Sequence, residues 1–373
     1  MGKSMKILLT GAGGFLGKNF LWAARQADDM EVLAYHHEMG ADVLMAMCQD
    51  CDAVVHLAGV NRPETEQGFA DGNVGFAQKL VEYLEKRSEG CPVLFSSSMQ
   101  AEQDNAYGRS KREAERILLS YAAEAGTQAM IYRLPNVFGK WCRPEYNSVV
   151  ATFCHHIAYG LPIRIDDARH ELHLVYVDDV IASFLDALRG KGKITDGFSS
   201  VEPVYACTVG KLAELIQSFR DDRQTLGIPA LGDPFVQKLY STYLSYLPED
   251  GFSYPLQSHA DARGAFTEFL RTEGQGQISV NLSHPHIVKG GHWHQSKHEK
   301  FLVVAGTGVI RLRQVGSDKI FTYDVSGDNL EVVEIPPGYT HEIENTGETD
   351  MVTIMWANEN FDPAHPDTYR MEV

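Results

Sequence analysis

Short apolar runs alternate with amphipathic stretches through the first half of the chain. The apolar runs cover residues 6–10, 31–34, 53–57, 93–95 and 129–133, and helical periodicity covers residues 20–25, 74–86 and 107–125. Alternation of strand and helix is typical of a parallel sheet with helices on both faces. We therefore expect an α/β fold with a doubly wound parallel sheet, whose ligands bind at the carboxyl ends of the strands.

The pattern changes near residue 247. Beyond it, short apolar runs at 277–282, 301–304, 309–313, 319–323, 331–335 and 351–356 are separated by Gly, Asp, Asn and Pro. Several short strands at this spacing indicate a β-sandwich or a β-barrel. We place the domain boundary near residue 245, which divides the chain into an α/β part (1–245) and an all-β part (246–373).

Composition and charge narrow the class of protein. The 373 residues include 33 Lys and Arg against 50 Asp and Glu, which gives a net charge of −17. Such an acidic protein is a poor partner for nucleic acid or for an anionic membrane surface. No apolar run is long enough to span a bilayer, and the chain enters its first strand without a signal peptide. Six scattered cysteines favour reduced thiols, so we expect a cytoplasmic protein.

A glycine-rich turn follows the first strand. Residues 11–17 read GAGGFLG and precede a predicted helix. Gly11 permits a tight turn, Gly14 lets the backbone approach a pyrophosphate, and Gly17 lets helix and strand pack closely. The N-terminus of the following helix attracts phosphate through its free N–H groups. This strand–turn–helix context predicts a dinucleotide site of the Rossmann type.

The end of the second strand indicates which dinucleotide is bound. An acidic residue at this place would bind the ribose 2′-hydroxyl of NAD. Here residues 31–34 are followed by Tyr35, His36 and His37, and Glu38 comes a few residues late. Since both histidines can donate to a 2′-phosphate, we expect NADPH, with His36 as a contact. The alternative, that both are solvent-facing loop residues, stays open.

Several motifs of the first half resemble the extended short-chain dehydrogenase/reductase family. They are GxxGFLG at 11–17, HLAG at 56–59, NVG at 73–75, SSS at 96–98, YGRSK at 107–111, RLPNV at 133–137 and VYVDDV at 175–180. The resemblance implies a set of cofactor-binding residues from these motifs: Gly11, Gly14, Phe15, Leu16, Gly17, Leu57, Ala58, Gly59, Tyr107, Lys111, Leu134 and Asn136.

The same resemblance implies a catalytic group. Tyr107 and Lys111 are four residues apart, so they project from one helix face. A free phenol has a pKa of roughly 10, and a neighbouring ammonium favours its ionised form. Ser98 would hold the substrate carbonyl, with Ser97 as the alternative. Sugar-nucleotide 4,6-dehydratases carry an acidic pair directly after this serine or threonine. Here Met99 and Gln100 follow Ser98, which favours carbonyl reduction over dehydration. Candidate substrate contacts are Asn147, Arg164 and His173.

A second constellation lies in the all-β part. HWH at 292–294, with Glu299 and Gly306, fits the first cupin motif, and PxG at 336–338, with His341 and Asn345, fits the second. His292 and His294 alternate on a strand, so their imidazoles share one face. Together with Glu299 and His341 they suit Zn²⁺, with Fe²⁺, Mn²⁺ or Ni²⁺ as alternatives. A metal-free cupin barrel that packs these groups as polar residues stays open.

Further segments extend the likeness to the whole chain. DARGAFTE at 261–268, KHEKF at 297–301, WANE at 356–359, FDP at 361–363 and PDTY at 366–369 resemble deoxysugar 3,5-epimerases. Both parts, in this order, resemble the bifunctional CapF-type enzymes of capsular polysaccharide synthesis, which help to make UDP-N-acetyl-L-fucosamine. The resemblance implies that the cupin inverts C3 of a UDP-4-keto-6-deoxy amino sugar. The reductase part then reduces the C4 ketone with NADPH to a UDP-2-acetamido-2,6-dideoxy-L-talose. It also implies a homodimer formed through the cupin.

Two questions remain open at the level of sequence. The C3 proton could be moved by Lys297 and Tyr339, which adjoin the ligand positions, and Arg263 and Lys289 are candidates for holding the diphosphate. Lys300 and Glu268 are alternatives for the proton transfer. A different interpretation is a one-step NADPH-dependent ketoreductase whose cupin is a non-catalytic sugar-sensing or dimerisation module. Structural zinc would leave the same ligand pattern.

Overall fold

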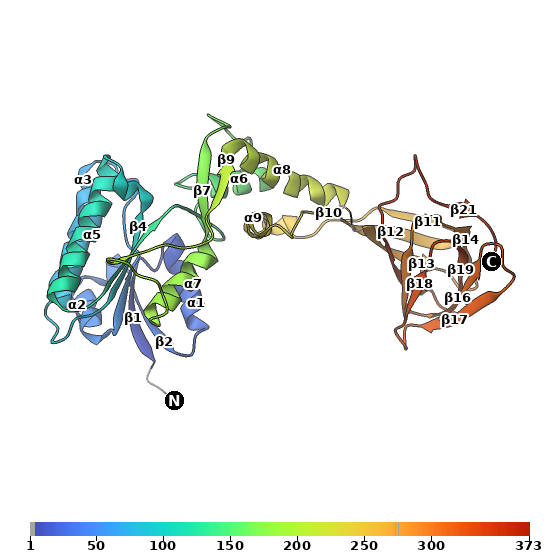
Figure 1. The fold of residues 1–373 in the computed structure, drawn as a ribbon, viewed down its shortest axis with the longest axis horizontal. Coiled ribbons are helices and arrows are strands. Elements are labelled where there is room, and N and C mark those ends of the chain that lie inside the picture. Colours follow the sequence, from blue (N-terminus) through green and yellow to red (C-terminus); the bar gives the residue numbers. More distant parts are fainter. Residues whose placement is uncertain (1–3, 273, 275) are drawn as a thin grey trace. The chain divides into compact units, whose positions relative to one another are not determined.

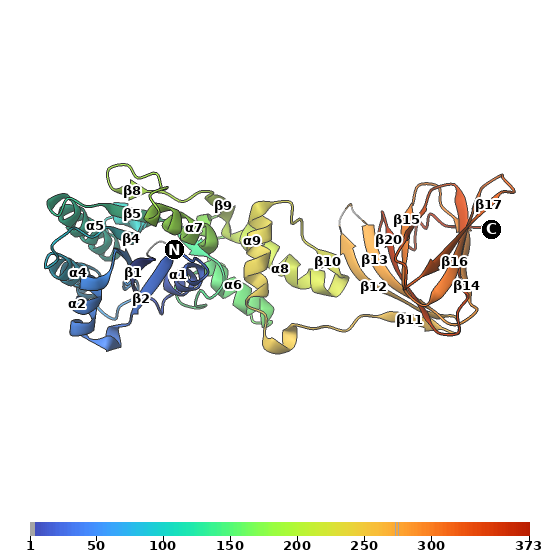
Figure 2. The same cartoon turned by 90° about the horizontal axis from the view of Figure 1, so that it is seen from below.

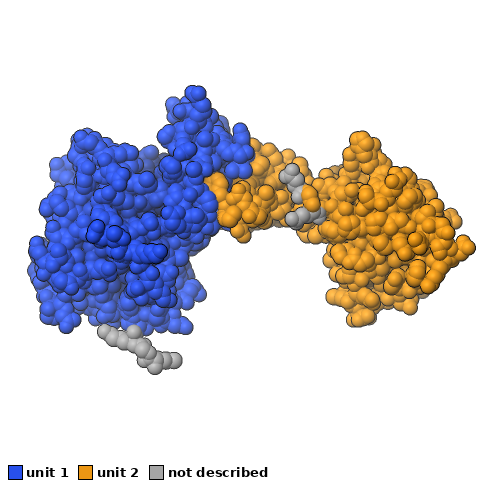
Figure 3. Space-filling model, in the orientation of Figure 1, with its two compact units in different colours: residues 1–216, 238–247 blue, residues 217–237, 248–373 orange. Residues whose placement is uncertain are grey.

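The chain forms two compact units. The computed structural model describes residues 4–272, 274 and 276–373. One unit contains residues 1–216 and 238–247, and the other contains residues 217–237 and 248–373 (Figure 3). The short segment 217–237 belongs to the second unit because its strand β10 (Gly227–Ile228) pairs with β12 (Gly264–Thr272).

The first unit is built on a parallel sheet of six strands in the order β2-β1-β3-β4-β5-β8 (Figure 1). Their bounds are β1 Met5–Thr10, β2 Met30–Tyr35, β3 Ala53–His56, β4 Val93–Ser98, β5 Ala129–Leu134 and β8 Phe198–Ser199. The order reverses between β1 and β3, so the loops that leave these strands diverge at their carboxyl ends. This switch point is where open α/β sheets bind ligands.

Helices cover both faces of this sheet, as the doubly wound prediction requires. On one face α1 (Phe15–Arg25) and α7 (Val177–Leu188) share an apolar core with alternate side chains of the strands. On the other face lie α2 (Ala41–Asp50), α4 (Phe76–Leu84) and α5 (Ala106–Glu124). The predicted Rossmann-type fold is confirmed.

The remaining elements of the first unit flank the carboxyl edge of the sheet. They are α3 (Gln67–Phe69), α6 (Val149–Ala158) and the small sheet β6-β7-β9, formed by Asn136–Phe138, Glu171–Tyr176 and Tyr205–Thr208. Two longer helices, α8 (Val209–Thr225) and α9 (Pro234–Leu244), follow. Among the described residues, no helix combines the length and apolarity needed to cross a membrane.

The second unit consists of two largely antiparallel sheets that enclose an apolar core (Figure 2). One sheet has the order β10-β12-β13-β20-β15-β18, with β11 on β12, and the other has the order β17-β16-β19-β14-β21. Their remaining bounds are β11 Ser258–Asp261, β13 Gly276–Ser283, β14 Val288–Trp293, β15 Glu299–Ala305, β16 Thr307–Gln314, β17 Ile320–Ser326, β18 Val332–Ile335, β19 Tyr339–Asn345, β20 Met351–Ala357 and β21 Tyr369–Arg370. The expected all-β cupin fold is confirmed.

Two candidate active sites

The glycine turn between β1 and α1 is closely packed. Gly11 has φ +74°, and a Cβ atom on it would lie 2.5 Å from the main-chain nitrogen of Ala58. A Cβ atom on Gly17 would lie 2.0 Å from the carbonyl oxygen of Gly11. Gly14 is the N-cap of α1, and its lack of a side chain leaves the N–H groups of the first turn without a side-chain cap. These groups fit a pyrophosphate, because helix N-termini attract anions.

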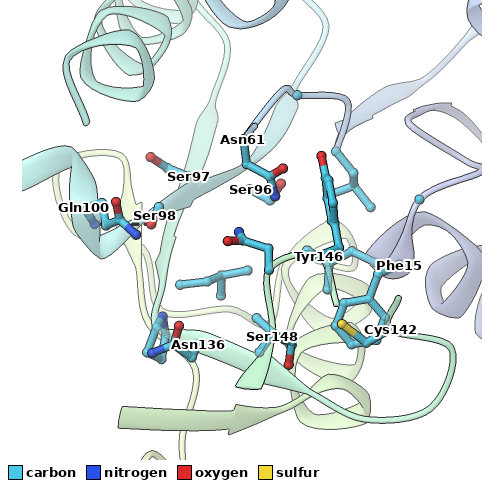
Figure 4. Close-up of a pocket in the computed structure, with 18 of the residues that line it drawn as sticks. Phe15, Asn61, Ser96, Ser97, Ser98, Gln100, Asn136, Cys142, Tyr146 and Ser148 are labelled. Carbon is cyan, nitrogen blue, oxygen red and sulfur yellow. Dashed lines mark hydrogen bonds between the residues drawn. The ribbon is translucent and has the colours of Figure 1, made fainter. Parts of the chain in front are cut away.

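A cavity of about 970 Å³ opens over this turn and over the carboxyl ends of β3, β4 and β5 (Figure 4). Most residues expected to bind cofactor or substrate line it: Gly11, Gly14, Phe15, Leu16, Gly17, Leu57, Gly59, Ser98, Tyr107, Lys111, Leu134, Asn136, Asn147 and His173. The sheet therefore gathers in one cleft groups that lie more than 150 residues apart in the sequence.

Three expected contacts lie outside the cavity lining. Ala58 lies behind Gly11 and limits the space of the turn. His36 is exposed, and its imidazole is 3.9 Å from where a Cβ atom of Gly13 would stand. Arg164 is 88% exposed and pairs with Asp166 at 2.7 Å, so it extends into solvent.

The short connection from Ser98 to Tyr107 folds tightly against the start of α5. The Asn105 side chain caps the helix by accepting a 2.7 Å hydrogen bond from the Gly108 N–H. A Cβ atom on Gly108 would lie 2.2 Å from the Gln100 carbonyl oxygen. Glycine at this position thus allows the tight turn and places Tyr107 in the first turn of the helix.

Ser98 and Tyr107 meet at the cavity. Burial raises the pKa of the Tyr107 phenol, and a hydrogen bond with the Ser98 hydroxyl lowers it in part. The Ser97 hydroxyl has another role, because it donates a hydrogen bond to the buried Glu115 carboxylate. Arg133 binds the same carboxylate through Nη2 at 2.7 Å and Nε at 3.0 Å. Of the two serines, Ser98 thus contacts the phenol, and Ser97 belongs to a buried ionic network.

Lys111 is buried on α5, the helix that also carries Tyr107. Its ammonium group donates a 3.0 Å hydrogen bond to the Ser96 carbonyl oxygen and lies 4.7 Å from the centre of the Phe95 ring. Burial lowers the pKa of Lys111 to about 8, and the charge of Glu115 one turn along the helix opposes this shift. The ammonium form therefore predominates at neutral pH and is lost as the pH rises through about 8.

Asn73 has a structural role that the NVG motif alone did not define. Its side-chain amide accepts a 2.8 Å hydrogen bond from the Val60 N–H and donates at 2.9 Å to the Val60 carbonyl oxygen. A third hydrogen bond, 2.9 Å long, reaches the Ser110 hydroxyl on α5. Asn73 thus joins the loop after β3 to the helix that carries Tyr107 and Lys111. The NVG motif was its only signal in the sequence.

The second site brings together all four expected metal ligands. One ligand atom from each of His292, His294, Glu299 and His341 lies within 4.8 Å of the others. Glu299 Oε2 is 3.3 Å from His294 Nε2 and 3.4 Å from His341 Nε2. His292 comes from β14, His341 from the paired strand β19, and Glu299 from the start of β15.

The chemistry of this group fits a divalent cation. Within the described residues, His294 Nε2, Glu299 Oε2 and His341 Nδ1 are buried without a hydrogen-bond partner, which is costly in a protein interior. Burial and the neighbouring histidines lower the pKa of His292 to about 4, so its imidazole is neutral, as a ligand must be. A metal ion held among the four side chains would give a partner to His294 Nε2 and Glu299 Oε2, which face each other at 3.3 Å.

Asp367 supports the metal ligands from outside. Its carboxylate accepts hydrogen bonds from the N–H groups of Gln295, Ser296 and Lys297, at 2.9, 2.8 and 2.9 Å. These bonds, against the effect of burial, hold the pKa of Asp367 well below its usual range. Its main-chain oxygen also accepts a hydrogen bond from His294 Nδ1, which directs Nε2 toward the other ligands. The PDTY segment at 366–369 was the only signal for Asp367 in the sequence.

The other expected residues of the second unit differ in their surroundings. Lys297 is half-buried in the turn between His294 and Glu299, and Tyr339 lies half-buried two residues before His341 on β19. Arg263 is exposed and pairs with Asp261 at 2.7 Å. Lys289 is half-buried and donates hydrogen bonds to Asn281 Oδ1 at 2.9 Å and to the Leu282 carbonyl oxygen at 2.7 Å. Of the alternatives, Lys300 pairs with Glu334, and Glu268 pairs with Arg271.

Known proteins match both parts of the chain. Residues 7–196 match the NAD dependent epimerase/dehydratase family, and residues 259–369 match the polysaccharide biosynthesis C-terminal domain. A protein of Pseudomonas aeruginosa, named UDP-2-acetamido-2,6-beta-L-arabino-hexul-4-ose reductase, is 44% identical over 370 residues, which are 99% of each chain. The crystal structure of the capsular polysaccharide assembling protein CapF from Staphylococcus aureus aligns with a TM-score of 0.93 at 48% identity, over 99% of this chain and 100% of that chain.

The chain belongs to the CapF family. A more distant structure, UDP-glucuronic acid 4-epimerase from Bacillus cereus, aligns with 58% of this chain at a TM-score of 0.52 and 18% identity, and shares the fold. The resemblance found in the sequence is therefore confirmed, and so is its order of an epimerase/reductase part followed by a β part. The match of residues 7–196 to an NAD-dependent family supports a nicotinamide cofactor for this CapF-type chain. The roles of single residues stay predictions.

Proposed function

We propose that this CapF-type protein is a bifunctional UDP-sugar enzyme. Residues 246–373 epimerise C3 of a UDP-4-keto-6-deoxy-N-acetylhexosamine, and residues 1–245 then reduce its C4 ketone with NADPH. The product is UDP-2-acetamido-2,6-dideoxy-L-talose, a precursor of UDP-N-acetyl-L-fucosamine. The observation that carries the proposal is that one chain holds a Ser98–Tyr107–Lys111 cleft and a separate group of three histidines and a glutamate. The name of the Pseudomonas relative supports the reduction of a 4-ketosugar.

Reduction requires a hydride at C4, which the nicotinamide supplies when bound, and a proton at the ketone oxygen. The Ser98 hydroxyl holds the ketone oxygen beside the Tyr107 phenol, which donates the proton. The Lys111 ammonium stabilises the resulting phenolate. Asn147 and His173 line the same cavity and are suited to contact the sugar.

Epimerisation uses the acidity that the C4 ketone confers on C3. A base removes the C3 proton, the electron pair moves to the ketone oxygen, and an acid returns a proton to the opposite face. We assign these roles to Lys297 and Tyr339, since Lys297 lies between two ligands and Tyr339 shares a strand face with His341. A divalent cation, which we expect to be Zn²⁺, would supply positive charge near the ketone or hold these elements together. Arg263 and Lys289 remain our candidates for the diphosphate.

NADPH is favoured over NADH by the end of β2. No acidic residue follows Tyr35 directly, and the exposed His36 lies beside the glycine turn. A neutral or protonated imidazole can donate to a 2′-phosphate, where a carboxylate would repel it. Comparison of kcat/KM for the two cofactors tests this choice, and His36→Ala should reduce the preference for NADPH.

Deuterium exchange tests the two-step scheme. The full-length protein is incubated in D₂O with the UDP-4-keto sugar and without NADPH, and the sugar is examined by NMR. Deuterium at C3 is the expected result. No exchange would contradict epimerisation and would favour a one-step reductase with a non-catalytic second unit.

Two variants separate the steps. His292→Ala should abolish exchange but leave the reduction of an already epimerised ketone intact. Tyr107→Phe should remove NADPH oxidation and spare exchange at C3. If Tyr107→Phe retains NADPH oxidation, the assignment of the proton donor is wrong.

We further propose a homodimer formed through the second unit. On the sheet that contains β13 and β20, the polar Gln277, Ser279, Asn281 and Ser283 are buried. Neighbouring apolar residues form a row across four adjacent strands on the opposite face: Val280, Ile354, Leu302 and Val332. Ile354 is 38% exposed and Val332 is 51% exposed. An apolar row of this kind supports a protein interface.

The oligomeric state of a charged variant tests the dimer. Ile354→Asp should convert the dimer into a monomer in light scattering coupled to size exclusion. Ile320→Asp is the matched control, because Ile320 is 48% exposed on β17 of the other sheet. A dimer that survives Ile354→Asp would rule out this face.

A further inference from the structure

Two arginines converge on one aromatic ring beside the nucleotide cleft. The Cζ atoms of Arg143 and Arg62 lie 5.3 and 5.9 Å from the centre of the Tyr146 ring. Arg143 and Tyr146 line the cavity of about 970 Å³, as does Asn61, the neighbour of Arg62 (Figure 4). Among the described residues, neither guanidinium group has a carboxylate partner or a hydrogen bond.

The loop that carries Arg143 is fixed in an unusual conformation. Trp141 and Glu145 have φ angles of 68° and 54°, which are costly for residues other than glycine and concentrate at functional sites. The Tyr246 hydroxyl donates a 2.5 Å hydrogen bond to the Cys142 carbonyl oxygen. The Glu145 carboxylate lies 2.8 Å from His156 Nε2. The acidic side chain of this loop therefore has a partner of its own, and the loop is held in place from both sides.

The charges of the two arginines at the Tyr146 ring favour the binding of an anion. Two guanidinium groups near one ring repel each other, and each exposed cation–π contact returns only about 0.5–1 kcal/mol. The whole protein carries a net charge of −17, so cations without acidic partners stand out against their surroundings. Ser148, the N-cap of α6, lines the same cavity and brings the positive end of that helix to it.

We propose that Arg62 and Arg143 clamp the diphosphate of the UDP-sugar, with the Tyr146 ring fixing their spacing. A diphosphate carries at least two negative charges, and its oxygens match the fork of a guanidinium group. The inference rests on the proposed function, which brings two nucleotide diphosphates into this cleft. The N-terminus of α1 binds the diphosphate of the cofactor, and the arginine clamp binds the diphosphate of the substrate.

Calorimetric titration of the full-length protein with UDP tests the clamp. Arg62→Gln and Arg143→Gln should each raise the Kd for UDP at the site of the first unit roughly tenfold to a hundredfold, the range for a lost charge-assisted hydrogen bond, and leave any UDP binding at Arg263 and Lys289 unchanged. The Kd for NADPH should stay within about twofold, since general electrostatics between exposed charges is weak. Arg143→Lys should recover part of the UDP affinity, because lysine keeps the charge but not the fork.

Arg112→Gln is the matched control, since Arg112 is exposed on α5 and does not line the cavity. UDP affinities equal to that of Arg112→Gln would overturn the clamp. An equal or larger loss for NADPH would overturn its assignment to the substrate. UDP binding requires no turnover, so the arginine clamp and the proposed two-step reaction can be contradicted independently of each other. Wild-type protein that binds UDP through the arginines but shows no exchange at C3 would contradict the epimerase and leave the clamp standing.

Discussion

The Lys111 ammonium group and the Ser96 carbonyl oxygen are joined by a 3.0 Å hydrogen bond. This bond ties α5 to the end of β4. Because Ser98 follows Ser96 by two residues and Tyr107 precedes Lys111 by one helical turn, the same bond helps to set the separation of the serine and the phenol. Lys111 therefore acts by position as well as by charge.

The low pKa of Lys111 predicts a pH limit for the reduction. Its ammonium form is lost as the pH rises through about 8, and with it the stabilisation of the Tyr107 phenolate. We expect kcat/KM for the reduction to fall above this pH. In Glu115→Gln the negative charge that raises the pKa of Lys111 is gone, so the fall should begin about one pH unit lower.

The control for this shift is Glu113→Gln on the same helix. The Glu113 side chain is 41% exposed and pairs with Arg116, so its loss should leave the pH profile unchanged. Identical profiles for the two variants would show that Glu115 has no influence on Lys111.

The two neighbouring serines should respond differently to alanine. Ser98→Ala removes the hydroxyl that contacts Tyr107, and we expect kcat for NADPH oxidation to fall about 100-fold, as for other lost oxyanion contacts. Ser97→Ala removes a donor to the buried Glu115 carboxylate. It should lower the free energy of unfolding by about 1–2 kcal/mol and leave kcat within a few-fold. Urea titration and steady-state kinetics measure both effects, and the reverse pattern would assign the catalytic role to Ser97.

Gly108 should be intolerant of a side chain. In Gly108→Ala the new Cβ atom would meet the Gln100 carbonyl oxygen at 2.2 Å, so the start of α5 must shift. We expect a loss of about 1–3 kcal/mol in the free energy of unfolding together with a lower kcat, because Tyr107 moves with the helix. Gly75→Ala is the control, since its Cβ atom would lie 3.7 Å from the Ala70 carbonyl oxygen. Equal stability of the two variants would contradict this account.

Local sequence rules recovered the features that depend on spacing along the chain. The glycine turn, the Tyr107–Lys111 pair and the three histidines with Glu299 follow from helical, strand or motif spacing, and the structure brings each group together. Arg164 was a candidate substrate contact. The structure instead leaves it in solvent beside Asp166, and sequence alone does not give the direction of a loop side chain.

Contacts between distant segments were beyond such rules. Glu115 and Ser97 meet through the packing of α5 on β4, and Asp367 reaches a turn 70 residues earlier. None of these contacts follows from periodicity or motif spacing. They depend on how the elements pack, which only the folded structure reveals.

Asp367 should control how tightly the second unit holds its metal. Asp367→Asn keeps the size of the side chain but replaces a charged acceptor of three N–H groups by an amide, one end of which can only donate. The turn before Glu299 then loses its anchor, and His294 loses part of its orientation. We expect metal affinity to fall about 10- to 100-fold, measured by competition with a chelator, and exchange at C3 to fall with it. Asp362→Asn is the control, because Asp362 contacts His365 and the Ala364 N–H in the same segment and none of the four ligands. Equal metal affinity in both variants would show that the turn is held without the Asp367 carboxylate.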